Sequence, residues 1–423
     1  MDAACARASW AGWLLLIPAT LAAGAAAGDA IPRRWLPVDD AGWSILAPSP
    51  DSRLIYVSSS RGSDATGQAY APSQDAIGDD PFLPKGPVKP FKTLATAREQ
   101  SRDGHPDWLL LRRGDMWREA LYAPANGRSA REPAVIAAYG DGPARPQLRP
   151  RGKRSGLSFD IHRGFHDIAV VGVEFYASHK DPQSDDFDPT SRMRAGVRFF
   201  LSSKPTAFGR RLLVEDCCLR FCGATFMVAR DARGGPTERL TGLVFRRNLV
   251  LDNYSRISHS QGTYASGISV LLEENTYDHN GWLIRERGNR KDRGGATIFN
   301  HNTYFCDCHH VLFRRNLFLR ASSIGTKWTA NSGRGSAHHL VLDDNLYVEG
   351  EIGISMGGNK TGPLRFKDVR VTNNVFLHVG RGRPTLRNLG WYVGATDWDG
   401  GLVANNLLAL QTSDEVRNVF GLK

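Results

Sequence analysis

Cysteine is scarce in this sequence, and the few cysteines present do not suit a disulfide-bonded scaffold. The 423 residues include six cysteines, and Cys5 lies in an N-terminal leader, so the mature chain keeps an odd number. At least one thiol is therefore unpaired within a monomer. This composition excludes a domain built on a disulfide framework.

Long apolar runs are also missing beyond the N-terminus. The first residues combine Arg7, the apolar run WLLLIPATLAAG and small residues near Ala25–Gly28, which is the layout of a cleaved secretory signal peptide. The run is shorter than the roughly 20 residues that a membrane-spanning helix needs. We predict a signal peptide over residues 1–28 and a secreted or periplasmic protein without stable membrane insertion.

Clustered basic segments are absent, although the chain is basic overall. The sequence has 54 Lys and Arg against 43 Asp and Glu, a net charge of +11. Because the arginines are scattered, the pattern gives no support for a nucleic-acid partner. For an exported protein we expect the acidic partner to be an anionic polysaccharide, bound by a monomer.

A repeat dominates the rest of the chain. Segments such as LVFRRNLVLDN and VLFRRNLFLRA alternate apolar and charged residues, reach an asparagine, and begin a second alternation. The shared asparagines are Asn248, Asn275, Asn316, Asn345, Asn374 and Asn406, with separations of 27, 41, 29, 29 and 32 residues. Two earlier segments fit with Asp216 and Gly172 in the asparagine place.

This pattern predicts an all-β fold, a right-handed parallel β-helix. Period-two alternation interrupted at a fixed point indicates short strands separated by bends, and stacked repeats then share one core. At the bend, we expect the asparagines to adopt left-handed backbone angles and to hydrogen-bond one another. A β-propeller is disfavoured, because its blades repeat at about 40–50 residues.

The N-terminal part carries a resemblance to a known family. LIYVSSSRGSDATG, a polar insertion and then KPFKTLATAREQ resemble the opening of secreted parallel β-helix proteins of the pectate-lyase-like superfamily. The resemblance implies a capping strand and helix, which protect the open end of a solenoid. We therefore assign residues 29–105 to a cap region with a polar loop and residues 106–423 to the β-helix.

Candidate site residues recur at similar distances from the repeat asparagine. Arg285 and Lys327 lie 10 and 11 residues after Asn275 and Asn316, and HSQGTY and HNTY repeat a His and a Tyr before them. We predict Lys327 as the base, with His301 as its replacement, and Tyr304 as the acid, with Arg285 as the fourth catalytic residue. The predicted substrate contacts are His259, Tyr264, His279, Asn280, Trp282, Asn302, Arg320 and Arg334.

No metal cofactor is predicted. In CDCHH, alternation places Cys306 and Cys308 on one side of a strand and Asp307 and His309 on the other, so core packing is favoured over a zinc site. Calcium is not favoured, because the middle rungs offer bases rather than oxygen ligands. The acidic pairs beside the repeat asparagines, such as Glu273–Glu274, are interpreted as solvated bend residues.

This inventory suits β-elimination, in which a cation neutralises a uronic-acid carboxylate while a base and an acid move protons. It resembles alginate-lyase and chondroitinase-B-like β-helix lyases, which use Lys and Arg on adjacent rungs. The prediction is a polysaccharide lyase acting on alginate or another exopolysaccharide. The alternatives are a mannuronan-type C5-epimerase and a non-catalytic glycan-binding or envelope structural protein.

Overall fold

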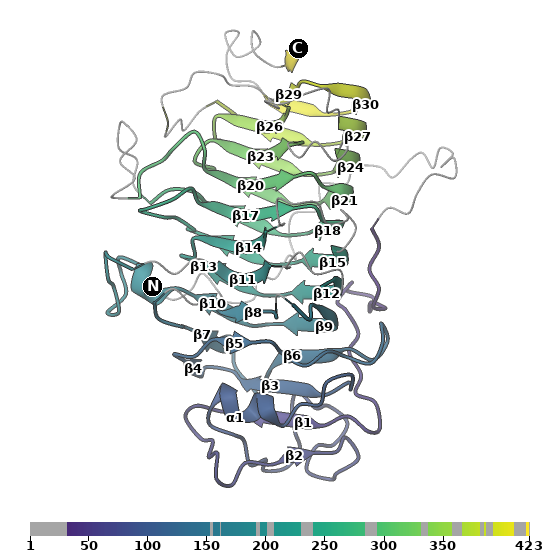
Figure 1. Ribbon diagram of the computed structural model, residues 1–423, viewed down its shortest axis with the longest axis vertical. Coiled ribbons are helices and arrows are strands. Elements are labelled where there is room, and N and C mark those ends of the chain that lie inside the picture. The colour runs from purple at the N-terminus through teal and green to yellow at the C-terminus, as the bar shows by residue number, and fades with distance from the viewer. Residues whose placement is uncertain are drawn as a thin grey trace.

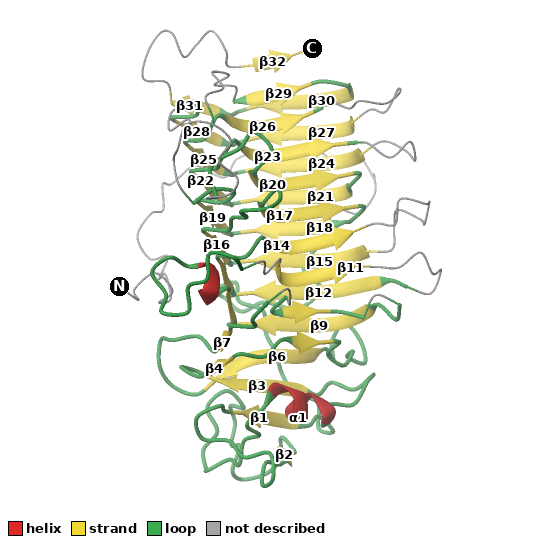
Figure 2. Cartoon of the chain, turned by 60° about the vertical axis from the view of Figure 1, so that its left-hand side comes forward, coloured by secondary structure: helices red, strands yellow, loops and turns green. Residues whose placement is uncertain are grey.

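The computed structural model shows a solenoid whose turns stack along one axis and whose strands form three long sheets (Figures 1 and 2). Each turn of the chain adds one strand to the first, the second and the third sheet, and then returns to the first. The expected parallel β-helix is confirmed. The described residues are 32–152, 155–160, 162–191, 195–200, 207–229, 240–283, 294–330, 337–357, 366–380, 385, 392–409 and 420–422, so the predicted signal peptide lies outside them.

The strands pair in parallel throughout the described residues, except that β1 and β2 are antiparallel. The first sheet contains, in spatial order, β2 (Ala69–Tyr70), β1 (Leu54–Val57), β3 (Trp108–Arg112), β6 (Ala134–Tyr139), β9 (Phe165–Val171), β12 (Gly209–Glu215), β15 (Leu240–Arg246), β18 (Val270–Glu273), β21 (His309–Arg314), β24 (Ala337–Asp343), β27 (Phe366–Thr372) and β30 (Trp398–Ala404). The second contains β4 (Met116–Trp117), β7 (Gln147–Leu148), β10 (Glu174–Tyr176), β13 (Cys218–Arg220), β16 (Leu249–Leu251), β19 (Thr276–Asp278), β22 (Leu317–Leu319), β25 (Leu346–Val348), β28 (Val375–Leu377) and β31 (Leu407–Ala409). The third contains β5 (Leu121–Tyr122), β8 (Leu157–Ser158), β11 (Ala195–Phe200), β14 (Ala224–Ala229), β17 (Gln261–Ser266), β20 (His301–Cys306), β23 (Ile324–Thr329), β26 (Ile352–Met356), β29 (Val393–Ala395) and β32 (Phe420–Leu422).

A short helix lies at the N-terminal end of the solenoid, beside β1 and β3 (Figure 1). Helix α1 (Leu94–Glu99) begins after Thr93, whose hydroxyl accepts a hydrogen bond from the Thr96 backbone N–H, as an N-cap residue does. It buries Leu94 and Ala97 against the core. A single 3₁₀ turn, η2 (Ser178–Lys180), lies after β10. None of the described helices has the length and apolar character of a membrane span.

The interior of the solenoid is stacked from equivalent residues of successive turns. On the second sheet, the inward rings of Tyr277, Phe318, Tyr347 and Phe376 stack with centroids 5.3, 5.0 and 4.9 Å apart. Offset stacking of this kind adds to the burial of apolar area. The regular stack fixes the register in which the outward residues of successive rungs meet.

The first bend, between the first and second sheets, is built on the predicted asparagine ladder. Asn248 donates its backbone N–H and its side-chain amide to Oδ1 of Asn275, at 3.0 and 2.9 Å. The same two bonds join Asn275–Asn316, Asn316–Asn345, Asn345–Asn374 and Asn374–Asn406. The residue before each asparagine, such as Arg247 or Glu274, has the positive φ, at 53° and 56°. The expectation that the asparagines themselves are left-handed was therefore wrong.

The residue predicted for the ladder one rung earlier, Asp216, was also wrong, by one position. Cys217, and not Asp216, donates its N–H to Oδ1 of Asn248 at 2.9 Å. Asp216 has a φ of 54° and occupies the left-handed position instead, as does Gly172 on the preceding rung. A buried cysteine thus replaces the asparagine where the ladder begins, because only its backbone N–H is needed there.

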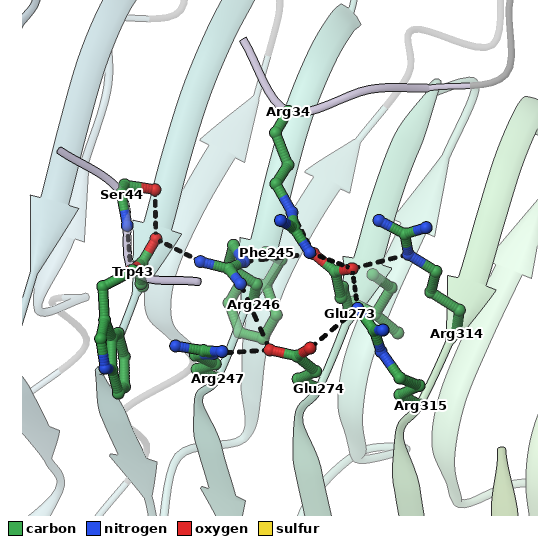
Figure 3. Close-up of polar contacts among 12 residues, drawn as sticks. Arg34, Trp43, Ser44, Phe245, Arg246, Arg247, Glu273, Glu274, Arg314 and Arg315 are labelled. Carbon is green, nitrogen blue, oxygen red and sulfur yellow. Dashed lines mark hydrogen bonds and ion pairs between the residues drawn. The ribbon is translucent and has the colours of Figure 1, made fainter. Parts of the chain in front are cut away.

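The outer face of the first sheet is covered by the chain that precedes β1. Leu36 belongs to the same apolar cluster as outward residues of successive strands, among them Leu213, Val244 and Leu271. Next to this apolar layer, Arg34 forms two hydrogen bonds to Glu273 and Ser44 bonds Glu215 (Figure 3). The segment that contains Arg34 and Ser44 therefore seals this face of the solenoid.

Glu273 is the centre of a buried charge network, which contradicts its interpretation as a solvated bend residue. Its carboxylate, with no exposed surface, accepts bonds from Arg34, Arg246, Arg314 and Arg315 (Figure 3). Burial opposes ionisation of Glu273, but the hydrogen bond from Arg34 and the nearby guanidinium charges lower its pKa to about 2. Glu273 and Arg246 at its centre are paired and have no exposed surface, so we assign the network a structural role.

Candidate functional site

The predicted catalytic residues of the third sheet lie side by side. Tyr264, Tyr304, Lys327 and Ser355 occupy one register position on β17, β20, β23 and β26. The rings of Tyr264 and Tyr304 meet edge to face, with centroids 5.5 Å apart. The tyrosines of the two sequence echoes therefore stack, but the histidines do not, because Gln261 is the register partner of His301. His259 instead contacts Phe299, at 4.9 Å between centroids.

The Lys327 ammonium is held by uncharged groups of the neighbouring rung. It lies 3.3 Å from the Ser355 hydroxyl and donates to the Gly357 carbonyl at 2.9 Å. The predicted site residues Arg285 and Arg334 lie outside the described residues. A Cβ on Gly325, two residues before Lys327, would lie 2.8 Å from the buried Tyr347 ring. Gly325 therefore faces the core.

The two cysteines that follow Tyr304 point in different directions, which corrects the expectation that they share one side. Cys308 packs in the interior core, whereas the Cys306 sulfur accepts a hydrogen bond from Thr329 at 3.2 Å. Asp307 between them has a φ of 52°, so the chain bends there and the strand alternation does not continue. The five described cysteines are buried, and none of them forms a disulfide bond.

The second bend, between the second and third sheets, brings together a group of charged and aromatic side chains. Its left-handed residues stack from rung to rung as Asp252, His279, Arg320, Glu349 and His378, with φ between 43° and 59°. The first four donate their backbone N–H to the carbonyl of the last strand residue of the next rung, for example Asp252 to Asp278 at 3.1 Å. Because a left-handed residue interrupts the strand, its side chain leaves the bend toward the outside.

One half of this group is a carboxylate–imidazole pair beside an indole. Nδ1 of His279 lies 2.7 Å from Oδ1 of Asp252, whose side chain is 38% exposed. The His279 ring lies 4.2 Å from the Trp282 ring, between centroids. Trp282 is held by its indole N–H, which donates to the Arg320 carbonyl at 3.0 Å. A fixed, partly exposed indole of this kind suits stacking on a sugar ring.

The other half is an ion pair between the Arg320 guanidinium and the Asp278 carboxylate. Arg320 donates from Nε and Nη2 to the two oxygens of Asp278, at 2.7 and 2.5 Å. These hydrogen bonds raise the pKa of Arg320 above its ordinary value, so the guanidinium keeps its charge. Asp278 is the outward last residue of β19, and Leu251, which precedes Asp252, is its register partner. The carboxylates of Asp252 and Asp278 therefore belong to neighbouring rungs.

The two predicted amide contacts belong to a second asparagine ladder and not to a binding surface. Asn253 donates to Oδ1 of Asn280 at 2.8 Å, and Asn280 donates to Oδ1 of Asn302 at 3.1 Å. None of the three has exposed surface. Of the predicted substrate contacts, the second bend thus groups His279, Trp282 and Arg320, and it fixes Asn280 and Asn302 beneath them.

Sequence reasoning missed Asp252 and Asp278 as members of the site. Positions were measured from the asparagine of the first bend, so the residues of the second bend were not aligned with one another. The signal was present: Asn253 and Asn280 each follow the left-handed residue, as Asn248 and Asn275 do at the first bend.

Comparisons with known proteins give no family assignment. No family model matches the chain, and no curated protein matches it. Among solved structures, the chain is similar to the GH136 lacto-N-biosidase from Eubacterium ramulus. The native protein gives a TM-score of 0.41 at 16% identity, and its selenomethionine derivative gives 0.37 at 15%. Each match covers 85% of this chain and 68% of the other. At these values the similarity does not identify the substrate of this chain.

The prediction of a polysaccharide lyase was wrong. The solved structures that the chain resembles are of a hydrolase and not of a lyase. The described geometry adds a separate reason, because the Lys327 ammonium is engaged by Ser355 and Gly357. The resemblance on which the lyase rested holds only at the coarser level of the parallel β-helix fold.

Proposed function

We propose that this protein is a carbohydrate-active hydrolase that binds a glycan at the second bend and cleaves a glycosidic bond there. The observation that carries the proposal is the pair of carboxylates, Asp252 and Asp278, on neighbouring rungs beside Trp282. Neighbouring rungs are about 5 Å apart, and two-carboxylate glycosidases place their carboxyl groups from about 5 Å apart in retaining enzymes to about 9.5 Å apart in inverting ones.

The two carboxylates have different partners, which suits different roles. Asp278 is oriented by the Arg320 fork and is available as the carboxylate that attacks or stabilises the sugar carbon. Asp252 shares a hydrogen bond with His279, so this pair is suited to move the proton to the leaving oxygen and to take one from water. The bond between the anomeric carbon and the glycosidic oxygen breaks, and water supplies the hydroxyl of the new reducing end.

The partner in this proposal is a polysaccharide met outside the cytoplasm. The net charge of +11 and the half-exposed Arg320 favour an anionic chain over a neutral one. Trp282 supplies an apolar face for one sugar ring, and the stacked rungs offer further positions along the axis.

The test is hydrolysis of a panel of neutral and uronic-acid-containing glycans by the purified chain. Products are identified by mass spectrometry, because hydrolysis adds one water and leaves saturated ends. We expect Asp252→Asn and Asp278→Asn each to lower turnover by about 10²-fold or more. Asp399→Asn, an exposed carboxylate on β30, is the matched control and should keep wild-type turnover. Wild-type turnover in both site variants would contradict the proposal.

A further inference from the structure

A cluster of histidines lies on the first sheet, at the start of β21 and β24. His309 and His338 are register partners on neighbouring rungs. The next residue on each strand, His310 and His339, is left-handed, with φ of 49° and 54°. The rings of His310 and His339 therefore stack, with centroids 4.8 Å apart and 25° between their planes. Both strands carry the same local bulge, so four imidazoles meet at one place.

Three of these imidazoles have the spacing of metal ligands. The ligand nitrogens of His310, His338 and His339 all lie within 4.8 Å of one another. Zinc binds imidazole nitrogen at about 2.0–2.1 Å, which sets nitrogens about 3.4 Å apart in a tetrahedral site. Small rotations of half-buried rings close that difference. Among the described residues, these three form the one group of His, Cys, Asp or Glu that converges this closely.

A carboxylate on the next rung orients one of the rings. Nδ1 of His339 lies 2.8 Å from Oδ2 of Asp368, the left-handed residue of β27 in the same column. This contact engages Nδ1 of His339, so Nε2 is the nitrogen that would face a metal ion. A carboxylate behind a coordinating imidazole is the usual arrangement around zinc, where it fixes the tautomer and strengthens the ligand.

The nearby positive charges are paired with carboxylates, one of which is Asp368 itself. Lys367 is the register partner of His338, but its ammonium lies 3.9 Å from Asp399. Arg370 lies 3.5 Å from Asp368. Four adjoining imidazoles would repel one another if protonated, whereas a divalent cation binds their neutral forms.

We propose that His310, His338 and His339 form a binding site for one divalent transition-metal ion, with Zn²⁺ as the probe, and that Asp368 is its positioning residue. Imidazole ligands suit zinc and its neighbours, rather than calcium or magnesium. Three protein ligands leave a fourth position open to water or to another ligand. The site is on the first sheet and is independent of the hydrolytic site proposed at the second bend. It departs from the sequence-based expectation of no metal.

The experiment uses the full chain without a histidine tag, stripped with a chelator and titrated with Zn²⁺ against a chromophoric competitor. We expect one Zn²⁺ per chain. The double variant His310→Asn/His339→Asn should lose at least about 100-fold in affinity, and asparagine is chosen because it tolerates left-handed angles. Asp368→Asn should lose about 10–100-fold. His105→Gln, in the N-terminal region, is the control and should bind as the wild type does.

X-ray absorption of the zinc-loaded wild type gives a readout that does not depend on how the variants fold. A shell of imidazole nitrogens at about 2.0–2.1 Å supports the site. Equal affinity in the wild type and the double variant, or a zinc environment without imidazole, would overturn the proposal.

Discussion

The two bends that flank the second sheet share one backbone design but have different surroundings. Each has a left-handed residue followed by a buried asparagine that bonds the asparagine of the next rung. At the first bend, the ladder runs from Asn248 to Asn406, and the charged column beside it is sealed by the segment that carries Arg34. At the second bend, the ladder is Asn253–Asn280–Asn302, and the charged column stays half exposed.

The difference shows that the covering of a bend, and not its geometry, separates scaffold from candidate site. Glu273 and Asp278 are both outward carboxylates held by arginines on neighbouring rungs. Glu273 has no exposed surface, whereas Asp278 lies beside the exposed side chains of Arg320 and Asp252. The Glu273 carboxylate is therefore closed to solvent, whereas the Asp252 carboxylate remains accessible.

The largest expected effect on stability is at the first bend. Glu273→Ala removes the shared partner of Arg34, Arg246, Arg314 and Arg315, and Arg246 is fully buried. Breaking a buried pair in this way should lower the free energy of unfolding by about 3–5 kcal/mol. Denaturant titration measures it, and a loss below about 1 kcal/mol would show that the network is not structural.

Lowering the pH should also reveal the contribution of Glu273 to stability. In the folded protein the pKa of Glu273 is lowered from its ordinary value of 4.5 to about 2. A lowered folded pKa contributes stability above the unfolded pKa, and this contribution is lost as pH falls from about 4.5 toward about 2. Glu273→Gln should flatten the pH dependence of the unfolding midpoint in that window. An unchanged slope would contradict the assignment.

The next largest effect on stability is expected for the asparagine ladder. Asn316→Ala removes the acceptor of the Asn275 N–H and amide and leaves buried groups unpaired. The expected cost is about 1–3 kcal/mol, measured by thermal and denaturant unfolding. A midpoint equal to that of the wild type would show that the ladder adds little beyond geometry.

The smallest effect on stability is expected at the second bend. The Arg320 side chain is 53% exposed, so Arg320→Ala should change the free energy of unfolding by no more than about 1 kcal/mol. Turnover should fall nevertheless, because Asp278 loses the fork that orients it. A large loss of stability with unchanged turnover would place Arg320 in the scaffold.

The solenoid could be predicted from the sequence, because residues at equivalent positions of successive repeats lie next to one another in a solenoid. The asparagines from Asn248 onward were predicted, and only their backbone angles and the rung before them were wrong. The burial of Glu273 could not be predicted, because Arg34 lies 239 residues away and belongs to no repeat.

The candidate site was harder to predict for a related reason. The tyrosines of the two echoes, Tyr264 and Tyr304, were correctly placed on neighbouring rungs, yet the hydrogen-bond partners of Lys327 depend on side-chain packing that periodicity does not report. Asp252 and His279 meet because two left-handed residues stack, and the asparagine that follows each of them was the one sign of this bend in the sequence.

The most direct test measures turnover and unfolding free energy together for Asp278→Asn and Glu273→Gln. The account predicts that Asp278→Asn loses at least about 10²-fold in glycan hydrolysis while its stability changes by no more than about 1 kcal/mol. It predicts that Glu273→Gln loses stability and keeps the turnover of its folded fraction. Full hydrolysis by Asp278→Asn, or an equal loss of stability in both variants, would contradict the distinction between the two bends.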